Sequence, residues 1–473
     1  MVRALVCGTR GRWFEPTQLY QKNEKKKKIK PSKELPLGFV DRQEKELLTR
    51  DFIISNIKEV MIKYGFQYLE TPSFEYTDSI GKFLPDKERP DEGVFSFKDE
   101  KNWLSLRYDL TAPLARYIAK NYLEIPKPFK RYQLGTVWRN EKPGPGRFRE
   151  FLQFDADYVG TKNLQADAEL CVLISEILEK CGLAKDDYTV KISSREFTKE
   201  LFDELKIQSN EQSAVTLRAL DKIDRLGWEE VKKILGKGRE DKSGDFTKGA
   251  DLSEEQIKML EKRIKETKPS TSDILEIIKI FEAYNFTNYE YDPSIIRGLE
   301  YYTGPIFEVN LNFEVKNSKG KPIQFGSIGG GGRYDNLVSN FGNLDCPATG
   351  ISIGLDRLVY ALMQKKEFNI KPNKPVVICV FDKENIKDYI EILKKLRGAN
   401  ISSEVYPGEG NLKKQMQYAN KIGSPAVILY GENEIKSGKT TLRDLKSGKE
   451  SNIEIENLPN EIKKILWRFI KYF

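Results

Sequence analysis

Four short segments of this chain combine arginines, carboxylates, aromatic rings and glycines at close spacing. The most highly charged segment, at residues 135–151 (GTVWRNEKPGPGRFREF), has a proline- and glycine-rich turn flanked by arginines. Guanidinium groups suit phosphate because they are permanently charged and can donate two parallel hydrogen bonds. The other segments are residues 107–113 (RYDLTAP), 296–304 (IRGLEYYTG) and 350–358 (GISIGLDRL).

Each segment alone also has an ordinary structural explanation. An arginine-rich turn is usually a solvated surface, and the glycines at residues 329–332 fit a tight turn better than a nucleotide cradle. If adjacent Tyr301 and Tyr302 lie on a strand, one of the two rings should enter the core. The functional interpretation therefore depends on all four segments occurring together in one chain.

The chain has 473 residues and no histidine, where average usage would give roughly ten. No imidazole of the protein can act as a general base, bind zinc or complete a Ser-His-Asp triad. Catalysis must therefore use carboxylates, Arg, Lys, Tyr, backbone dipoles, metal ions or the substrate's own groups. Compositional drift and selection against this amino acid are both open explanations of the absence.

The composition is that of a globular cytoplasmic protein, with 39% hydrophobic and 32% charged residues. No apolar run approaches the roughly 20 residues needed to span a bilayer, so no membrane partner is expected. The net charge of +8 favours a polyanionic partner such as nucleic acid. The five cysteines form no CxxC pair, which indicates reduced thiols and no cysteine-rich zinc site.

The residue pattern predicts an α+β chain of several domains. A capping box of Asp41 and Glu44 should open a helix that stops at Gly65, and a second amphipathic helix should run from about Gln165 to Cys181. Strand-like segments alternate with polar turns from Trp103 to Gly160, as in an antiparallel sheet. The expected divisions are a core of residues 35–194 and 286–368, a Lys/Glu-rich helical insertion at 195–285, and, after a proline-containing linker, an α/β domain at 374–473.

The four segments together resemble the signatures of class II aminoacyl-tRNA synthetases, and specifically those of the histidyl-tRNA synthetase family. Residues 70–72 (ETP) are similar to motif 1, residues 139–151 to motif 2, and residues 354–357 (GLDR) to motif 3. Residues 297–302 (RGLEYY) resemble the segment peculiar to the histidine-specific members. The resemblance covers nearly all of residues 36–473. It implies an antiparallel catalytic sheet with a helical insertion and a C-terminal α/β anticodon-binding domain.

The resemblance also implies roles for single residues. Arg139 and Arg357 would grip the phosphates of ATP with Arg147, while Glu141 and Phe151 would bind the adenine. Arg297, with Arg139, would be catalytic at the α-phosphate. The residues implied for binding histidine are Asp109, Leu110, Thr111, Gln153, Asp157, Arg297, Tyr301 and Tyr302.

The implied chemistry needs no histidine side chain from the protein. The ionised carboxylate of free histidine attacks the α-phosphorus of ATP, and a terminal ribose hydroxyl of tRNA-His then attacks the adenylate. Positioning and charge stabilisation by arginines and Mg²⁺ suffice for the first step. We therefore expect ATP and Mg²⁺ as cofactors, L-histidine and tRNA-His as partners, and a homodimer. No residue is assigned as a metal ligand.

Two further features concern the branch of the family and the start of the chain. Asn140 replaces a histidine common in bacterial members, and the loop at residues 142–146 (KPGPG) looks like an alphaproteobacterial branch, so this loop is expected to contact the tRNA acceptor end. Residues 1–34 are expected to be a disordered leader or an incorrectly assigned start. Trp13-Phe14-Glu15-Pro16 back-translates to TGG TTC GAA CCC, which has the form of a tRNA T-arm.

Two other classes of protein also resemble this family and have different functions. One is the non-catalytic, synthetase-like regulatory subunit of ATP phosphoribosyltransferase, which usually lacks both the RGLEYY-type segment and the C-terminal domain. The other is a degenerate module that senses uncharged tRNA, in which the ATP-binding arginines tend to be lost. This chain has both features and retains Arg139, Arg147 and Arg357, so an active ligase is the favoured interpretation.

Overall fold

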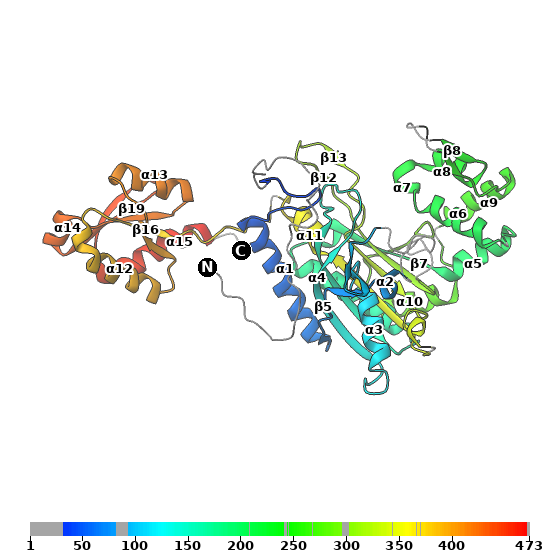
Figure 1. The fold of residues 1–473 in the computed structure, drawn as a ribbon. Coiled ribbons are helices and arrows are strands. Elements are labelled where there is room, and N and C mark those ends of the chain that lie inside the picture. The colour runs from blue at the N-terminus through cyan, green and yellow to red at the C-terminus, as the bar shows by residue number, and fades with distance from the viewer. Residues whose placement is uncertain are drawn as a thin grey trace, which may run out of the picture.

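A large mixed sheet forms the centre of the chain (Figure 1). The computed structural model describes residues 32–81, 93–207, 209–240, 244, 246–266, 268–295, 302–342, 344–365, 367–368 and 370–470. The central sheet has eight strands, and its neighbours are antiparallel except at the two edges, where β1 pairs with β5 and β10 with β7 in parallel. The order of the strands is β1 (Gln67–Tyr68), β5 (Phe129–Trp138), β6 (Glu150–Val159), β15 (Ala348–Gly354), β14 (Gly329–Arg333), β11 (Pro305–Leu311), β7 (Tyr188–Ser194) and β10 (Tyr289–Tyr291).

Helices cover one face of this sheet and bury its main hydrophobic core. Residues of β6 that alternate along the strand, Phe154, Ala156 and Tyr158, pack in this core. Because side chains alternate between the two faces of a strand, the intervening residues of β6 must point to the opposite face. The covering helices are α1 (Glu44–Lys63), α4 (Gln165–Lys180), α10 (Ser272–Ala283) and α11 (Leu355–Leu362).

The start of α1 differs from the prediction, whereas its end agrees. The N-cap residue is Gln43, and no side chain caps the helix, so the predicted capping box of Asp41 and Glu44 is wrong. At the other end, Gly65 has a φ of +72° and its N–H bonds to the carbonyl of Ile62 at 3.1 Å. Glycine tolerates this left-handed conformation, which ends the helix as predicted.

The region from residue 103 to 160 contains a helix that the strand-like pattern did not reveal. Helix α3 (Thr111–Lys120) lies between the strands along the chain. It buries Leu114, Ala115 and Ile118 in a second cluster that also contains Phe129 of β5 and Tyr334, the residue after β14. A small antiparallel sheet precedes it, in the order β2 (Phe74–Tyr76), β4 (Asn102–Leu106) and β3 (Ser96–Asp99), with α2 (Thr77–Gly81) after β2. A two-stranded ribbon of β12 (Val315–Lys316) and β13 (Pro322–Ile323) follows β11.

The glycines at residues 329–332 form most of strand β14 in the middle of the sheet, so the expected tight turn is wrong. A Cβ on Gly331 would lie 2.0 Å from the carbonyl oxygen of Gly350 on β15. The neighbouring strand therefore approaches too closely for any side chain at this position.

A helical segment with its own core is inserted after β7 (Figure 1). Its helices bury Phe197, Leu217, Val231 and Leu260 together with their neighbours. Helix α10 packs instead in the main core, so the separately packed part of residues 195–285 ends before Ser272. Its elements are α5 (Arg195–Glu204), α6 (Asn210–Leu220), α7 (Ile223–Leu226), α8 (Trp228–Leu235), β8 (Gly238–Glu240), β9 (Phe246–Lys248) and α9 (Glu254–Ile264).

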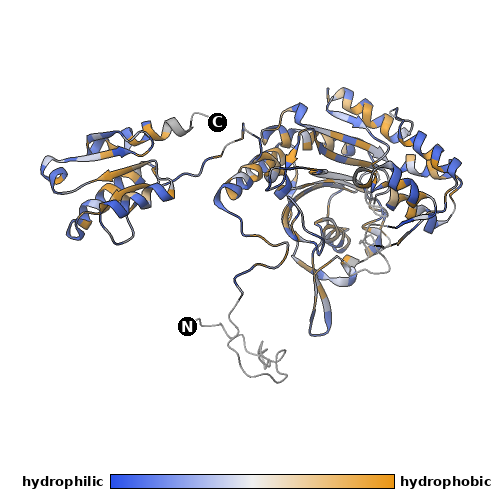
Figure 2. Cartoon of the chain, turned by 90° about the horizontal axis from the view of Figure 1, so that it is seen from above, coloured by the Kyte–Doolittle hydropathy of each residue, from blue (hydrophilic) through white to orange (hydrophobic). Residues whose placement is uncertain are grey.

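The C-terminal part lies apart from the large sheet in both views (Figures 1 and 2). Its apolar residues gather between a five-stranded sheet and helices, as the hydropathy colours of Figure 2 show. The sheet order is β17 (Ser403–Val405), β16 (Val376–Cys379), β18 (Ala426–Leu429), β19 (Lys439–Asp444) and β20 (Glu450–Glu454), and the helices are α12 (Ile386–Gly398), α13 (Leu412–Ile422), α14 (Glu432–Ser437) and α15 (Leu458–Ile470). The α+β class, with a largely antiparallel central sheet, a helical insertion and a C-terminal α/β domain, is confirmed.

Candidate active site

The open face of the β5–β6 hairpin carries a row of polar side chains. Register places Arg131 opposite Asp157, residue 133 opposite Asp155, and Gly135 opposite Gln153. Residues 153, 155 and 157 alternate with the core residues of β6, so all three face away from the covering helices. Two of these three, Gln153 and Asp157, are among the residues predicted to bind histidine.

Asp157 is buried at the floor of this face, with 2% of its surface exposed. Its Oδ2 lies 3.2 Å from Nη2 of Arg131, and its Oδ1 accepts a hydrogen bond from the hydroxyl of Tyr334. A Cβ on Gly350 of the adjacent strand would lie 2.1 Å from Oδ1 of Asp157, so a glycine is needed there. Burial raises the pKa of Asp157, which the Arg131 guanidinium opposes.

The N-terminus of α3 brings the residues predicted at 109–111 to the same face. Oδ1 of Asp109 accepts hydrogen bonds from the N–H groups of Thr111 at 3.1 Å and Ala112 at 2.9 Å, and so holds the first turn of the helix. Leu110 is fully buried, and its carbonyl accepts from Nη2 of Arg131 at 2.9 Å. The same guanidinium thus joins β5, β6 and the start of α3.

Asp155 lies between these elements and was missed by the sequence analysis. Its Oδ1 accepts from Nε2 of Gln153 at 2.7 Å, and its Oδ2 accepts from Oγ1 of Thr111 at 3.3 Å. Burial, and next the Asp157 carboxylate, raise the pKa of Asp155 to about 7, while Arg131 lowers it. The signal that could have found Asp155 is the period of two along β6, which puts it between Gln153 and Asp157 on one face.

Arg139 lies at the edge of this cluster, directly after β5 ends at Trp138. Its Nε donates to the carbonyl of Tyr108 at 3.2 Å, and its Nη2 lies 3.5 Å from Oε1 of Gln153. The guanidinium stacks over two rings, with its carbon 4.5 Å from the centroid of Tyr108 and 5.2 Å from that of Phe151. The predicted phosphate-binding arginine and adenine-stacking ring are therefore neighbours.

Glu141 follows in the loop and accepts a hydrogen bond from the hydroxyl of Tyr108. Because β5 ends at Trp138, both Arg139 and Glu141 lie in the hairpin loop and not on the strand. Tyr108 was also missed, although it stands beside predicted Asp109. Its ring and hydroxyl hold the two charged residues of the loop in place.

Arg357 packs on an aromatic ring that the sequence analysis did not single out. The guanidinium carbon of Arg357 is 4.4 Å from the centroid of Phe325, and Nη2 of Arg357 donates to the backbone carbonyl of Phe325. A Cβ on Gly146, next to Arg147 in the hairpin loop, would lie 3.0 Å from the same ring. Phe325 therefore lies between the motif 2 loop and the start of α11.

Arg107 ties the site to the strands that precede it. Its guanidinium donates to the carbonyls of Thr71 and Thr136, each at 2.7 Å, and it is nearly buried. Burial lowers the pKa of Arg107, which nearby carboxylates, including Asp155, oppose. The buried guanidinium of Arg107 thus connects the motif 1 region to β5 by hydrogen bonds.

The histidine-specific segment is described only at its C-terminal end. Arg297 and Tyr301 lie outside the described residues, so their predicted places in the site are not observed. Tyr302 is half-buried and packs against the cluster that contains Tyr334 and Leu114. Burial lowers the pKa of Arg195 at the start of α5 to about 10, an effect opposed by Tyr302.

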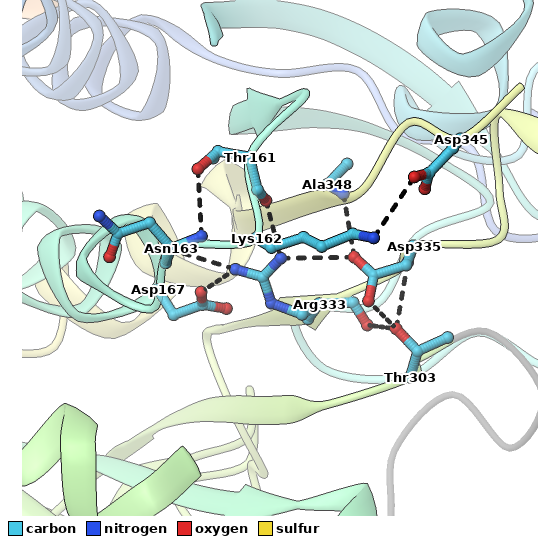
Figure 3. Close-up of polar contacts among 9 residues, drawn as sticks. All are labelled: Thr161, Lys162, Asn163, Asp167, Thr303, Arg333, Asp335, Asp345 and Ala348. Atoms are coloured by element: carbon cyan, nitrogen blue, oxygen red, sulfur yellow. Dashed lines mark hydrogen bonds and ion pairs between the residues drawn. The ribbon is translucent and has the colours of Figure 1, made fainter.

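A buried ion pair anchors the chain just after this segment (Figure 3). Arg333 at the end of β14 pairs with Asp167 of α4 and donates to the carbonyl of Thr161 at 2.9 Å and to Asp335 at 3.3 Å. Thr303 donates through its N–H to the carbonyl of Arg333 at 2.7 Å. The start of β11 is thereby fixed to the sheet and to α4.

Several polar residues of the C-terminal domain have structural roles in the fold. Asn411 caps α13 by accepting from the N–H of Lys414 at 3.1 Å, and Glu434 accepts from the N–H of Gly431 at 3.0 Å. Gln415 is buried and bonds to both backbone groups of Val380 at 2.8 and 2.6 Å. These contacts organise the loops at the end of β16.

Helices cover one face of the largely antiparallel sheet, and an arginine-flanked loop connects β5 and β6 beside the polar row of the other face. This is the catalytic fold of a class II aminoacyl-tRNA synthetase. A model of histidyl-tRNA synthetase matches residues 38–358, and a model of the anticodon binding domain matches residues 374–465. The chain belongs to the histidyl-tRNA synthetase family.

Individual relatives agree with this membership. The histidine–tRNA ligase of Bartonella quintana is 44% identical over 460 residues, which span 91% of this chain and 92% of that protein. That of Rhizobium meliloti is 44% identical over 94% of this chain and 93% of its own length. Both species are alphaproteobacteria, in agreement with the branch that the hairpin loop predicted.

Two solved structures share the fold. The histidyl-tRNA synthetase of Nostoc sp. PCC 7120 has a TM-score of 0.70 at 26% identity, and the match covers 92% of this chain and all of that one. A Bacillus halodurans protein described as an ATP phosphoribosyltransferase regulatory subunit/histidyl-tRNA synthetase has a TM-score of 0.61 at 22% identity and covers 82% of this chain and 97% of its own. The latter shows the shared fold alone.

Proposed function

We propose that this chain is a histidine–tRNA ligase, which activates L-histidine with ATP and transfers it to the 3′ end of tRNA-His. The observation that carries the proposal is the convergence of Arg139, Gln153, Asp157 and the start of α3 on one sheet face of a family member. In the first step the histidine carboxylate attacks the α-phosphorus and pyrophosphate leaves. In the second, the ribose hydroxyl of the tRNA attacks the adenylate carbonyl and AMP leaves.

The chain's own residues bind, orient and stabilise charge in these steps. Arg139, whose guanidinium packs on two rings, would stabilise charge at the α-phosphate, with Arg147 and Arg357 on the remaining phosphates. Glu141 would accept from the adenine amine and Phe151 would stack on its ring. Stacked guanidinium groups lose little conformational freedom on binding phosphate, which favours precise positioning.

The histidine subsite follows from the buried polar row. Asp157 would pair with the imidazole together with Tyr302, with Tyr301 completing the pocket wall. Asp109, Thr111 and Gln153 would hold the α-ammonium, because carboxylate, hydroxyl and amide oxygens accept hydrogen bonds from it. The backbone of Leu110 would line the pocket beside Arg131.

Magnesium enters this proposal as part of the nucleotide substrate. Among the described residues no group of three or more acidic, cysteine or histidine side chains is arranged to hold a metal ion. In nucleotide-binding enzymes Mg²⁺ usually keeps several waters and is held by substrate phosphates with only one or two carboxylates. We propose that Mg²⁺ arrives bound to the phosphates of ATP.

We further propose a homodimer formed through the small sheet and the adjacent β1 edge. One face of the small sheet exposes three rings, with 50% of Phe74, 53% of Tyr76 and 42% of Phe97 accessible. The opposite face buries Glu75, which pairs with Arg116 of α3 at 2.6 Å. A cluster of exposed rings of this kind marks an interaction surface.

The dimer is tested by charge placed in this patch. Tyr76→Glu should shift the molecular mass from dimer to monomer in sedimentation or light-scattering measurements, because a carboxylate would be desolvated at the interface. Phe246→Glu, at another exposed ring in the helical insertion, is the matched control and should leave the mass unchanged. A monomeric parent protein would contradict the proposal.

The tRNA partner is proposed on two parts of the chain. The C-terminal domain, which matches the anticodon-binding model, would contact the anticodon, and the loop at residues 142–146 would contact the acceptor end. None of the described helices is long and apolar enough to cross a membrane. We propose that the enzyme works in the cytoplasm, where its tRNA is used.

The activity is tested by ATP–pyrophosphate exchange with each of the twenty amino acids. Histidine alone should support exchange, and the protein should then charge tRNA-His. A regulatory subunit of a phosphoribosyltransferase would give neither reaction. Exchange supported better by another amino acid, or no exchange by the intact protein, would overturn the assignment.

Arg297→Ala tests the catalytic arginine proposed from the family motif. Exchange should fall by about 100-fold or more, because one preorganised donor to the reacting phosphate is lost. Circular dichroism and the melting temperature should match those of the parent protein. Unchanged exchange would remove the role given to Arg297.

A further inference from the structure

Asp155 is the one carboxylate of the polar row on β6 to which the ligase mechanism gives no role. It is 2% exposed and lies between Gln153 and Asp157 on the strand. Both of its oxygens accept hydrogen bonds from residues proposed to hold the α-ammonium. Nε2 of Gln153 donates to Oδ1 at 2.7 Å, and Oγ1 of Thr111 donates to Oδ2 at 3.3 Å.

The direction of these hydrogen bonds determines what the two partners can offer a ligand. An ionised carboxylate accepts hydrogen bonds and donates none. Gln153 must therefore turn its NH₂ group to Asp155, and its carbonyl oxygen then faces the side where Arg139 lies at 3.5 Å. Thr111 directs its single hydroxyl proton to Asp155, which leaves the lone pairs of its oxygen for a donor.

An α-ammonium group is a donor of three hydrogen bonds, and it therefore needs acceptors in fixed directions. We propose that Asp155 is a positioning residue that, in its ionised form, fixes Gln153 and Thr111 as acceptors for the α-ammonium of histidine. This inference rests on the proposed function and adds a residue to it. Asp155 does not contact the substrate in this scheme but acts through its two partners.

The charges around Asp155 bear on its protonation. Asp157 faces it from the same strand, Arg131 from β5, Arg107 from the segment before α3 and Asp109 from the start of α3. Burial raises the pKa of Asp155 to about 7, with Asp157 adding to the increase and Arg131 opposing it. As the pH falls through this value, a protonated Asp155 could donate to Gln153 or Thr111 and reverse one of the two hydrogen bonds.

Asp155→Asn is the first test, because asparagine has the same shape but must direct an NH₂ donor at one of the partners. The KM for histidine in ATP–pyrophosphate exchange should rise about tenfold or more. The KM for ATP should change by less than about twofold. The difference between variant and parent should shrink as the pH is lowered from 8 to 6, because Asp155 of the parent then becomes protonated.

Two competitive inhibitors separate positioning of the amine from general damage to the pocket. L-histidinol keeps the α-amine, and its Ki should rise in Asp155→Asn as the KM for histidine does. 3-(Imidazol-4-yl)propionate has no amine, and its Ki should stay within about twofold. Equal weakening of both inhibitors, or an unchanged KM for histidine, would overturn the inference.

A second pair of variants keeps the test decisive if Asp155→Asn does not fold. Thr111→Ser keeps the hydroxyl and should preserve the Ki of histidinol, whereas Thr111→Val should raise it while sparing the propionate. The absence of this contrast would overturn the inference. Loss of the proposed function gives a different result, because the parent protein itself would then show no histidine-dependent exchange.

Discussion

Single side chains of the site depend on small residues that face them from neighbouring strands. Gly350 of β15 pairs with Asp157 of β6. Gly135 of β5 faces Arg107, and a Cβ on Gly135 would lie 2.6 Å from Nη2 of Arg107. Real Cβ atoms do not approach other atoms this closely. Because these two glycines have no side chain, there is space beside them for the buried charged groups of Asp157 and Arg107.

Gly350→Ala should displace the Asp157 carboxylate and lower kcat/KM for histidine by at least about tenfold, because the added methyl group would lie 2.1 Å from Oδ1. Exchange kinetics measured against histidine and against ATP will show whether the loss is confined to the amino acid. Gly398→Ala is the matched control, because nothing lies within 4 Å of a Cβ there. Normal histidine kinetics in Gly350→Ala would contradict the close approach.

The sequence predicted the site residues that a family motif contains, and it missed those that only the fold brings in. Gln153, Asp157 and Arg139 were named in advance and lie together. Arg131 is 26 positions from Asp157 along the chain, and only the β5–β6 register makes them neighbours. Asp155 could have been inferred from alternation along β6, whereas Phe325 and Tyr334 could not.

At the scale of elements, one ion pair joins three parts of the catalytic core. Arg333 of β14 and Asp167 of α4 are both nearly buried, and Asp335 links the same guanidinium to the N–H of Ala348 on β15 at 3.2 Å. Burial raises the pKa of Asp167 to about 6, although Arg333 opposes the shift. In the network of Figure 3, the positive charge of Arg333 thus stabilises the buried carboxylate of Asp167.

Arg333→Met should lower the free energy of unfolding by about 3–5 kcal/mol at pH 8, because Asp167 would be left buried and charged without a partner. Without Arg333 the pKa of Asp167 should rise above about 6. The deficit should therefore be smaller at pH 5, where the carboxyl takes up a proton. Urea denaturation at both pH values measures this, and a deficit independent of pH would contradict the pairing.

The double variant Arg333→Met, Asp167→Asn supplies the control. It removes the uncompensated charge along with the cation, so part of the lost stability should return. If the double variant is as unstable as Arg333→Met at pH 8, the lost contacts of Arg333 with Thr161 and Asp335 carry the effect instead.

Elements were predicted well where a local signal decides them and poorly where packing does. Gly65 ended α1 as expected, because its left-handed φ of +72° favours glycine over other residues. Helix α3 was missed because aspartate and proline are common in turns. In the structure Asp109 accepts hydrogen bonds from N–H groups of the first turn of α3, and Pro113 is tolerated in that turn. The glycines of β14 have no strand propensity, and only the approach of β15 explains them.

At the scale of the whole molecule, the absence of histidine limits what can titrate near neutral pH. Unperturbed imidazole is the side chain that changes charge between pH 5 and 8, and this chain has none. Carboxylates whose pKa is raised by burial, Asp155 to about 7 and Asp167 to about 6, take that place among the described residues. Because the chain contributes no imidazole, the imidazole in the reaction is that of the substrate histidine.

The C-terminal domain has hydrophobic clusters of its own on both faces of its sheet, formed by residues such as Ile378 and Val427. An extended linker leads into it, and Lys374 at the end of that linker pairs with Glu44 at the start of α1. Separate cores joined by a short linker are the mark of units that fold independently. Histidine activation and anticodon binding should therefore be separable.

A chain truncated after residue 370 should keep histidine-dependent ATP–pyrophosphate exchange within a few-fold of the full chain, because every site residue named for ATP and histidine lies before the linker. Its kcat/KM for charging tRNA-His should fall by at least about 100-fold, since contacts worth several kcal/mol with the anticodon would be lost. Lys374→Ala in the full chain is the control for the ion pair with Glu44, and a partly exposed pair of this kind contributes about 1 kcal/mol or less. If the truncated chain charges tRNA as well as the full chain, the anticodon-binding role of the domain is wrong. If it folds but loses exchange, the catalytic core depends on the C-terminal domain in a way that the separate hydrophobic clusters do not indicate.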